Sequence, residues 1–383
     1  MNEKLERKVN LYTNIVFFVV IVLFVGLRIC GYYNLFAFMG KYASYYLSLI
    51  TQVGLIFLLP VFLLKTLSKS RTKEVFQFSC YKKTSFKVLF AAILLGIIVF
   101  FINVYVANFF NNIIGIFGYK HASSSSDAPA TWLSFFVELF CTALLPAVCE
   151  ETLNRGIFLN GHSMLGMRKS VLLSGLMFGL LHMNIEQFFY ATLIGFLLGY
   201  LCWWCGSIYP GMIVHFMNNA LSVFFSFSAR RGWGIGGVFD KIAEFVSHNG
   251  TLGFVIFCLF MAFLVIVGYL LIRQMQAETV KRQFSRRKND FAKFALREAF
   301  LMDVAKLNEQ TTAGESKDMV LPANEEDFMR FVEKNIDNIV KNAAKSEVFT
   351  HKFKMDKKAK ILLIASIVLS GAMTLLTFVW GLL

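Results

Sequence analysis

Charged side chains are scarce in this chain of 383 residues. Only 16% of its residues are charged, whereas a soluble protein carries about a quarter, and 57% are hydrophobic. Proline is rare as well, with five in the whole chain. This composition excludes an ordinary soluble domain, and several apolar runs of roughly 20 residues match the length that crosses a bilayer. We therefore expect an integral, multi-pass protein of the cell membrane.

The seven cysteines give no sign of a disulfide framework, because they lie mostly inside apolar segments. Cys202 and Cys205 have the spacing of half a zinc site, but no second pair accompanies them, and we interpret them as packing residues. The first apolar run, residues 11–33, is too long for the hydrophobic region of a signal peptide and lacks a small-residue cleavage site. It is therefore predicted to be a membrane span.

The net charge of +14 is concentrated near the ends of apolar segments. Lysine and arginine gather at residues 4–8, 65–87, 168–169 and 273–293. Positive residues near the ends of spans mark the cytoplasmic side, so we expect the N-terminus in the cytoplasm. The basic residues also favour contact with anionic lipids of the bilayer. Because no nucleic-acid module interrupts the spans, we expect no nucleic-acid partner.

The chain is predicted to form an all-α, polytopic transmembrane helical bundle. The segments that we assign as spans are 11–32, 43–65, 86–108, 132–152, 171–184, 187–205, 208–228, 251–273 and 360–382. The fifth and sixth are short, and a membrane tolerates short helices where protein or a water-filled cavity satisfies the backbone. We therefore expect a cavity between spans four to seven that is accessible from the cytoplasm.

Three regions of the chain differ in composition. We predict a membrane-embedded core over residues 1–273 with its motif region at 132–228, a charged cytoplasmic helical segment over 274–358, and a C-terminal transmembrane helix over 359–383. Between Phe328 and Ala343 apolar residues recur at helical spacing, which predicts an amphipathic helix. Such a helix could lie on the membrane, dock on the core, bind a cytoplasmic partner or serve as a solvated linker.

Ionisable residues inside apolar spans are costly, so each is a candidate functional residue. Of six histidines, only His182 and His215 lie in predicted spans. At the end of span four, Glu150 and Glu151 are adjacent, and neighbouring side chains on a helix point about 100° apart. Glu151 and Arg155 are spaced i, i+4 and can pair on one face. This pairing leaves Glu150 free to face the cavity as a general base.

Two further spans carry polar residues one helical turn apart. Span five places Phe178 and His182 on one face, and span seven does the same for His215 and Asn219. Together with Glu150, these side chains supply a base for water, an orienting group and donors for an oxyanion, which are the needs of hydrolysis. Glu150, His182 and His215 also suit Zn²⁺, because that ion accepts carboxylate and imidazole ligands. Both alternatives stay open.

A function from another class fits single members of this set. A buried histidine or a Glu151–Arg155 pair could relay protons in a transporter or stabilise helix contacts. A proton-coupled transporter of this size would more often contain repeated halves, and we find no convincing repeat. An immunity or scaffold protein that keeps the fold without catalysis is a further alternative. Glu138 in span four, and Asn218 beside Asn219, are more readily explained as structural.

The motifs, taken in order, resemble those of the CAAX prenyl protease and bacteriocin-processing family of intramembrane proteases, also called the CPBP or Abi family. They are Glu150-Glu151-x-x-x-Arg155, Phe178-x-x-x-His182 and His215-x-x-x-Asn219. Each motif alone is weak, whereas three in order on successive spans are specific. The resemblance covers about residues 86–228 and implies an eight-helix core, to which the charged segment and the last span are additions.

The resemblance implies a peptidase that uses a water molecule activated by Glu150. His182 would assist this base, and His215 and Asn219 would bind the oxyanion. The supporting residues would be Glu151, Arg155 and Phe178. Members of the family are described both as metalloproteases and as glutamate-dependent proteases, so a Zn²⁺ cofactor stays open. The expected substrate is a hydrophobic, membrane-associated or lipidated peptide or protein.

Overall fold

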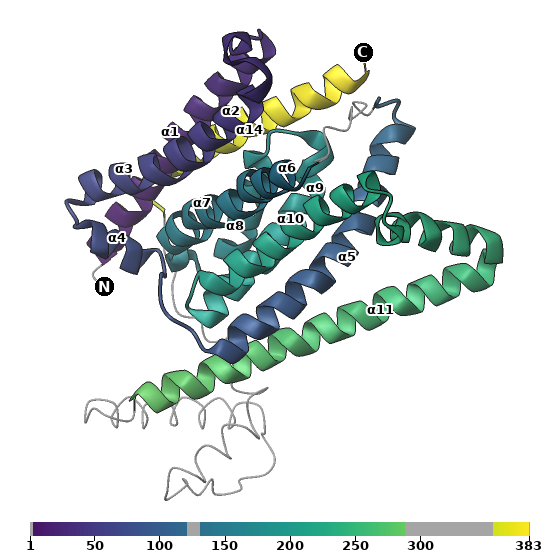
Figure 1. Ribbon diagram of the computed structural model, residues 1–383. Helices are drawn as coiled ribbons and strands as arrows, with labels where there is room; N and C mark the ends of the chain where they lie inside the picture. The colour runs from purple at the N-terminus through teal and green to yellow at the C-terminus, as the bar shows by residue number, and fades with distance from the viewer. Residues whose placement is uncertain (1–2, 121–130, 288–354, 383) are drawn as a thin grey trace, which may run out of the picture.

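The computed structural model describes residues 3–120, 131–287 and 355–382. Within these residues every regular element is helical and none is a strand. Eight helical segments of the described chain are long and apolar enough to cross a membrane, and they form a bundle (Figure 1). The prediction of an all-α, polytopic membrane protein is therefore confirmed.

The helices follow one another through mostly short connections. Their bounds in chain order are α1 (Glu3–Tyr32), η1 (Ala37–Tyr42), α2 (Ala43–Leu49), η2 (Ile50–Leu58), α3 (Leu59–Ser68), α4 (Thr72–Phe78), α5 (Phe86–Ile116), α6 (Trp132–Glu138), η3 (Leu139–Leu144), α7 (Leu145–Glu151), η4 (Thr152–Leu159), η5 (Ser163–Leu165), α8 (Met167–Leu181), α9 (Ile185–Cys205), α10 (Tyr209–Arg230), η6 (Gly234–Gly237), α11 (Val238–Arg287) and α14 (Lys357–Leu382). The segments η2, η3 and η4 are π-helical and join their neighbours into the continuous second span, Ala43–Ser68, and fourth span, Trp132–Leu159.

The fifth predicted span, 171–184, forms the short helix α8, which is not among the eight candidate spans. Its 15 residues extend about 22 Å, less than the ~30 Å of a hydrocarbon core. Much of this helix is buried, and it approaches α9 closely at glycines: a Cβ atom on Gly195 would lie 2.8 Å from the Cα atom of Gly175. In the described residues, the predicted nine spans are therefore corrected to eight spans and one short helix.

The fourth span is longer than predicted. It continues beyond residue 152 to Leu159, which places Glu150 about two turns before its end. Pro146 lies in the first turn of α7, and proline has no N–H to donate to the carbonyl four residues earlier, that of Thr142. The π-helical segments on both sides of α7 also interrupt the regular α-helical register. Such interruptions are frequent at functional sites, so this span is distorted around its glutamates.

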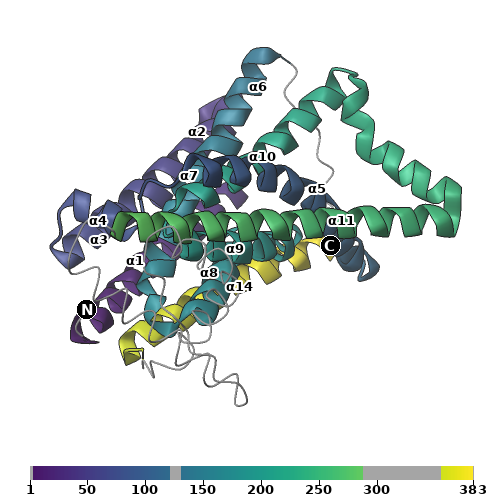
Figure 2. The same ribbon diagram turned by 90° about the horizontal axis from the view of Figure 1, so that it is seen from below.

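The first and last helices of the described chain, α1 and α14, pack against each other on one side of the bundle. The rings of Tyr32 on α1 and Trp380 on α14 are stacked with their centroids 4.8 Å apart. The Thr377 hydroxyl accepts a hydrogen bond from the backbone N–H of Ile185 at 3.0 Å. Figures 1 and 2 show α11 on the opposite side, next to α5. The last span, predicted as an addition to the core, therefore forms one of its walls.

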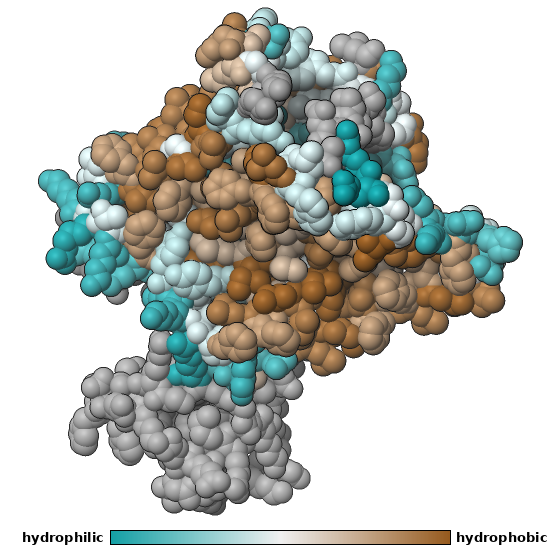
Figure 3. Space-filling model, viewed as in Figure 1, coloured by the Kyte–Doolittle hydropathy of each residue, from teal (hydrophilic) through white to brown (hydrophobic). Residues whose placement is uncertain are grey.

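Helix α11 is longer than the span predicted within it. It continues to Arg287, well past the predicted boundary at residue 273, and it bends at Gly250, whose φ of 52° favours glycine. The surface around α11 is largely apolar (Figure 3), as expected for side chains that face lipid. The amphipathic helix predicted between Phe328 and Ala343 lies outside the described residues.

Candidate active site

A fully buried ion pair lies behind the candidate active site. Arg155 donates from Nη1 to Glu151 Oε1 at 2.7 Å, and neither side chain is exposed. The pairing one turn apart that the sequence predicts is thus present. The second guanidinium nitrogen donates to the Gly195 carbonyl oxygen at 2.9 Å, and the guanidinium carbon lies 4.3 Å from the ring centroid of Phe178. These contacts from α9 and α8 hold Arg155 in place, so its positive charge stays next to the Glu151 carboxylate.

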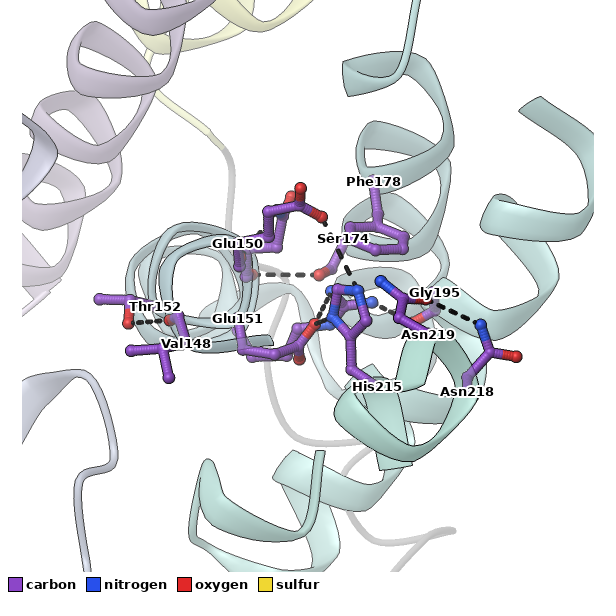
Figure 4. Close-up of polar contacts among 12 residues, drawn as sticks. Val148, Glu150, Glu151, Thr152, Ser174, Phe178, Gly195, His215, Asn218 and Asn219 are labelled. Atoms are coloured by element: carbon purple, nitrogen blue, oxygen red, sulfur yellow. Dashed lines mark hydrogen bonds and ion pairs between the residues drawn. The ribbon is translucent and has the colours of Figure 1, made fainter. Parts of the chain in front are cut away.

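His215 on α10 is oriented by the same carboxylate. Its Nδ1 atom lies 3.1 Å from Glu151 Oε1 (Figure 4). An ionised carboxylate can only accept, so Nδ1 carries a proton and donates it. The other ring nitrogen, Nε2, lies 4.0 Å from Glu150 Oε2, too far for a direct hydrogen bond. Glu151 therefore fixes His215 with its second nitrogen directed toward Glu150.

The two adjacent glutamates have different environments. Glu150 is 9% exposed and lines a cavity, whereas Glu151 is completely buried. The Oε1 atom of Glu150 accepts a hydrogen bond from Gln52 Nε2 at 2.8 Å, and its Oε2 atom accepts none from the described residues. Glu151 binds Arg155 and His215 through Oε1, and its Oε2 atom also lacks a partner, but this side chain does not line the cavity. Glu150 is therefore the glutamate that lines the cavity with an unpaired carboxylate oxygen.

His182 follows the last residue of α8, where the Phe178 carbonyl oxygen lies 2.8 Å from its Nδ1 atom. A carbonyl oxygen can only accept, so Nδ1 is protonated, and in the neutral ring Nε2 is an acceptor. The Phe178 ring lies edge-to-face with both histidines, with centroid distances of 5.1 Å to His182 and 5.6 Å to His215. Phe178 thus spaces the two imidazoles, which explains its position in the second motif.

The amides on α10 form a chain of hydrogen bonds to neighbouring spans. Asn219 donates to the Thr142 carbonyl oxygen at 3.0 Å. In a regular α-helix this carbonyl would accept from residue 146, but Pro146 has no N–H to donate. Asn218 donates to Asn219 Oδ1 at 3.0 Å and accepts from Asn103 Nδ2 at 3.3 Å. Asn218, interpreted from the sequence as structural, therefore orients the Asn219 amide.

A cavity of about 510 Å³ brings the candidate residues together. Its lining includes all four predicted catalytic residues, namely Glu150, His182, His215 and Asn219, as well as Phe178. Glu151 and Arg155 are not in the lining and lie behind it, as expected for supporting residues. The structure thus gathers the predicted residues around one space, although their catalytic roles stay predictions.

The cavity reaches further than the predicted location between spans four to seven. Arg28 near the end of α1, and Ser48 and Gln52 near the start of the second span, also line it. It therefore extends toward the end of the bundle opposite the basic loops at residues 65–87 and 168–169. If those loops are cytoplasmic, as predicted, the cavity extends toward the outer face. The predicted access from the cytoplasm stays a prediction.

Two residues of this cavity are missing from the set predicted from the sequence. Gln52 binds Glu150, and Arg28 donates to the carbonyl oxygen of His182 at 2.9 Å. Both signals were in the sequence, because Gln52 is an amide and Arg28 a charged residue inside a predicted span. The cost of a polar group inside a span, which singles out the two histidines, applies equally to them.

The predicted zinc ligands are not arranged for a metal ion. Within the described residues, no group of three histidine, cysteine, aspartate or glutamate side chains is placed to hold one. Of the predicted set of Glu150, His182 and His215, the last already uses one ring nitrogen on Glu151. The residues as placed do not fit Zn²⁺ as a resident ion, so we derive no chemical step through it.

These features define a class: a helical membrane protein with a carboxylate, two histidines and an amide around a cavity among its spans. Residues 132–221 match the family model described as "Type II CAAX prenyl endopeptidase Rce1-like". No curated protein and no solved structure matches the chain. The family match confirms the predicted resemblance to CAAX-type membrane proteases over this region.

Proposed function

We propose that the protein is an intramembrane endopeptidase in which Glu150 activates a water molecule. The observation that carries this proposal is the division between the two glutamates. Glu151 lies behind the cavity, and its Oε1 atom binds both Arg155 and His215, whereas Glu150 lines the cavity and its Oε2 atom has no hydrogen-bond partner among the described residues. A carboxylate that faces the cavity can take a proton from a water molecule bound there, whereas a carboxylate that is buried in an ion pair cannot reach that water.

The proposed reaction begins with water bound beside Glu150 Oε2. Glu150 takes one proton as the water oxygen bonds to the carbon of the scissile amide. The His182 ring, with its Nδ1–H on the Phe178 carbonyl, offers Nε2 as an acceptor that orients this water. When the C–N bond breaks, the protonated Glu150 donates its proton to the leaving nitrogen. Atoms and charges balance without a further reactant.

The oxyanion that forms on the substrate needs hydrogen-bond donors. Asn219 Nδ2 has a second N–H besides the one on the Thr142 carbonyl, and this side chain lines the cavity. His215 can donate from Nε2 only when its ring is doubly protonated, because Nδ1–H is already bound to Glu151. Both groups therefore serve as oxyanion donors in the proposal.

The expected substrate is a hydrophobic or lipidated peptide of the membrane. The cavity lies among spans rather than in an extramembrane domain, so a substrate must enter from within or beside the bilayer. The match to a family described as CAAX prenyl endopeptidases supports this class.

The test compares peptides in membranes and medium, by mass spectrometry, from cells that express wild-type, Glu150→Gln or Glu138→Gln chains at equal levels. Glu138 is the matched control, because it is a glutamate on the same span that does not line the cavity and takes no part in the Glu151–Arg155 ion pair. We expect a cleavage product that is lost in Glu150→Gln and kept in Glu138→Gln. Identical profiles for all three chains would contradict a peptidase and favour a transporter or scaffold.

A second arm addresses the metal. Purified protein is assayed on the identified peptide after dialysis against a strong chelator and again after Zn²⁺ is restored. We expect turnover to survive dialysis, since the described donors are not arranged around an ion. Loss of turnover that Zn²⁺ restores would replace the metal-free step with a metal-dependent one.

A further inference from the structure

A second cavity of about 730 Å³ adjoins the active-site cavity. Arg28, Ser48 and Gln52 line both, so the two spaces share one boundary. The second cavity lies between α1, the start of the second span and α14. Its walls are mainly apolar, with Phe24, Leu27, Met183, Met373, Leu376 and Trp380 among them. We call this second space the apolar chamber.

Arg28 is an unusual residue at that boundary. It lies within the first span, and its side chain is exposed where the two cavities meet. Its contacts are neutral: Nη2 donates to the His182 carbonyl oxygen at 2.9 Å, and the guanidinium lies 5.5 Å from the Phe24 ring centroid. Among the described residues no carboxylate pairs with it. A cation inside a span without a counter-ion is costly, so Arg28 is a candidate functional residue.

The contrast with Arg155 shows what Arg28 lacks. Arg155 is completely buried and neutralised by Glu151 at 2.7 Å. Arg28 has donors left over after its single bond to a carbonyl, because a guanidinium carries five N–H groups. The one carboxylate in the described lining of the active-site cavity, Glu150, is bound by Gln52, and His215 lies on its other side. Arg28 therefore offers an unfilled anion site next to the catalytic cavity.

We propose that Arg28 binds a carboxylate of the substrate, while apolar side chains next to that carboxylate occupy the apolar chamber. This inference rests on the proposed peptidase function and specifies the substrate of the same site. Guanidinium binds carboxylate through two parallel hydrogen bonds, and an apolar cavity favours apolar side chains. The substrate therefore carries an acidic group and a hydrophobic segment on one side of the bond that faces Glu150. The carboxylate is either the free C-terminus of the peptide or an acidic side chain.

Three peptides distinguish these two sources. All share one hydrophobic sequence of leucine and alanine with a fluorescent label, and they end in a free carboxylate, in a carboxamide, or in a carboxamide with one glutamate placed before it. Binding is measured on the Glu150→Gln chain, which cannot turn the peptides over, and on the same chain with Arg28→Gln. Binding by the Glu150→Gln chain tests the subsite even if no peptide is hydrolysed.

We expect the free-carboxylate peptide to bind roughly 10- to 100-fold more tightly than the carboxamide, and this ratio to fall to about one with Arg28→Gln. Recovery of tight binding by the glutamate peptide would assign the site to an acidic side chain, and no recovery would assign it to the C-terminus. Equal binding of all three peptides by the chain with Arg28 would overturn the inference. A ratio that survives Arg28→Gln would overturn it as well.

Two controls separate charge recognition from a structural effect. In Arg28→Gln the new amide can still donate to the His182 carbonyl, so a loss of function in this variant reports the missing charge. Arg168→Gln removes an exposed cation outside both cavities and should leave the ratio unchanged. With an identified substrate, Arg28→Gln should raise KM for acidic peptides and change kcat little. A fall in kcat on every peptide, charged or not, would show that Arg28 acts through His182 and overturn the assignment.

Discussion

The pattern Phe-x-x-x-His occurs twice within about 25 residues, and the two copies have different surroundings. Phe158 lies in the last turn of the fourth span with His162 just beyond it, and Phe178 and His182 lie at the end of α8. In both copies the histidine Nδ1 lies 2.8 Å from the carbonyl oxygen of the phenylalanine one turn earlier. The local sequence therefore produces the same turn and the same tautomer twice.

The two copies differ in what surrounds the second ring nitrogen of the histidine, Nε2. His162 is completely buried, and Asn14 on α1 lies 3.2 Å from its Nε2 atom. Asn14 in turn donates to the Asn10 carbonyl oxygen, which holds this polar group together. His182 instead lines the active-site cavity. A histidine with both nitrogens bound inside the protein stabilises the fold, whereas one with a nitrogen at a cavity can serve chemistry.

The largest expected effect is the difference in kcat between variants of the two histidines. His182→Gln is expected to lower kcat roughly 100- to 10,000-fold, because it removes the imidazole that orients the water for proton transfer to Glu150. His162→Gln should leave kcat nearly unchanged and instead lower the unfolding temperature. Turnover of the identified peptide and thermal unfolding in detergent measure the two effects. Similar loss of kcat in both variants would show that the pattern itself, rather than the cavity, determines the function.

Glu151→Gln should affect both properties at once. The change leaves Arg155 buried without its counter-ion and His215 without the carboxylate that orients it. We expect a loss of about 3–5 kcal/mol in the free energy of unfolding, as for a broken buried ion pair. Turnover per folded molecule should fall too. A Glu151→Gln chain as stable as the wild type would show that the buried ion pair contributes little to the fold.

The predictability of the site follows the same division between local and distant contacts. The pairs Glu151–Arg155, Phe178–His182 and His215–Asn219 depend on spacing along one helix, so the sequence is sufficient to place each on one face. The contact of Gln52 with Glu150 joins residues 98 positions apart, and that of Arg28 with His182 joins residues 154 apart. Helix periodicity carries no information about such pairs.

The spans show a parallel limit. Hydropathy located eight of the nine assigned spans, since lipid demands apolar length. The prediction ended the fourth span at residue 152 because Asn154 and Arg155, which follow, lower the hydropathy. Both side chains are buried in the structure and donate hydrogen bonds to neighbouring groups. Helix α8 is too short to cross a membrane, and much of it is buried against protein, which tolerates a short helix. Both deviations surround the candidate site, where contacts inside the bundle replace contact with lipid.

Low pH should weaken the His162 cluster in particular. Burial lowers the pKa of His162 to about 4, below the ~6.5 of an unfolded histidine. Protonation between these values therefore favours the unfolded chain. The contribution of His162 to the free energy of unfolding should be constant above about pH 6.5 and fall as the pH drops toward 4, by about 3 kcal/mol in total. The test is thermal unfolding from about pH 7.5 to 4.5 in wild type and His162→Gln. A pH dependence that is the same in both would rule out His162 as its source.

The smallest expected effect concerns the two amides that reach these sites from other spans. Asn14 lies against His162, and Gln52 donates to Glu150 at 2.8 Å. Gln52→Ala frees the Glu150 carboxylate to rotate and removes one donor, so we expect roughly a tenfold loss in kcat with little change in stability. Asn14→Ala should lower stability by about 1–3 kcal/mol and leave kcat unchanged, because it leaves a buried acceptor without a partner. The measurements are again turnover and thermal unfolding. If Gln52→Ala lowers stability as Asn14→Ala does, the amide beside Glu150 belongs to the packing of the bundle, and the distinction between the two polar clusters rests on the histidines alone.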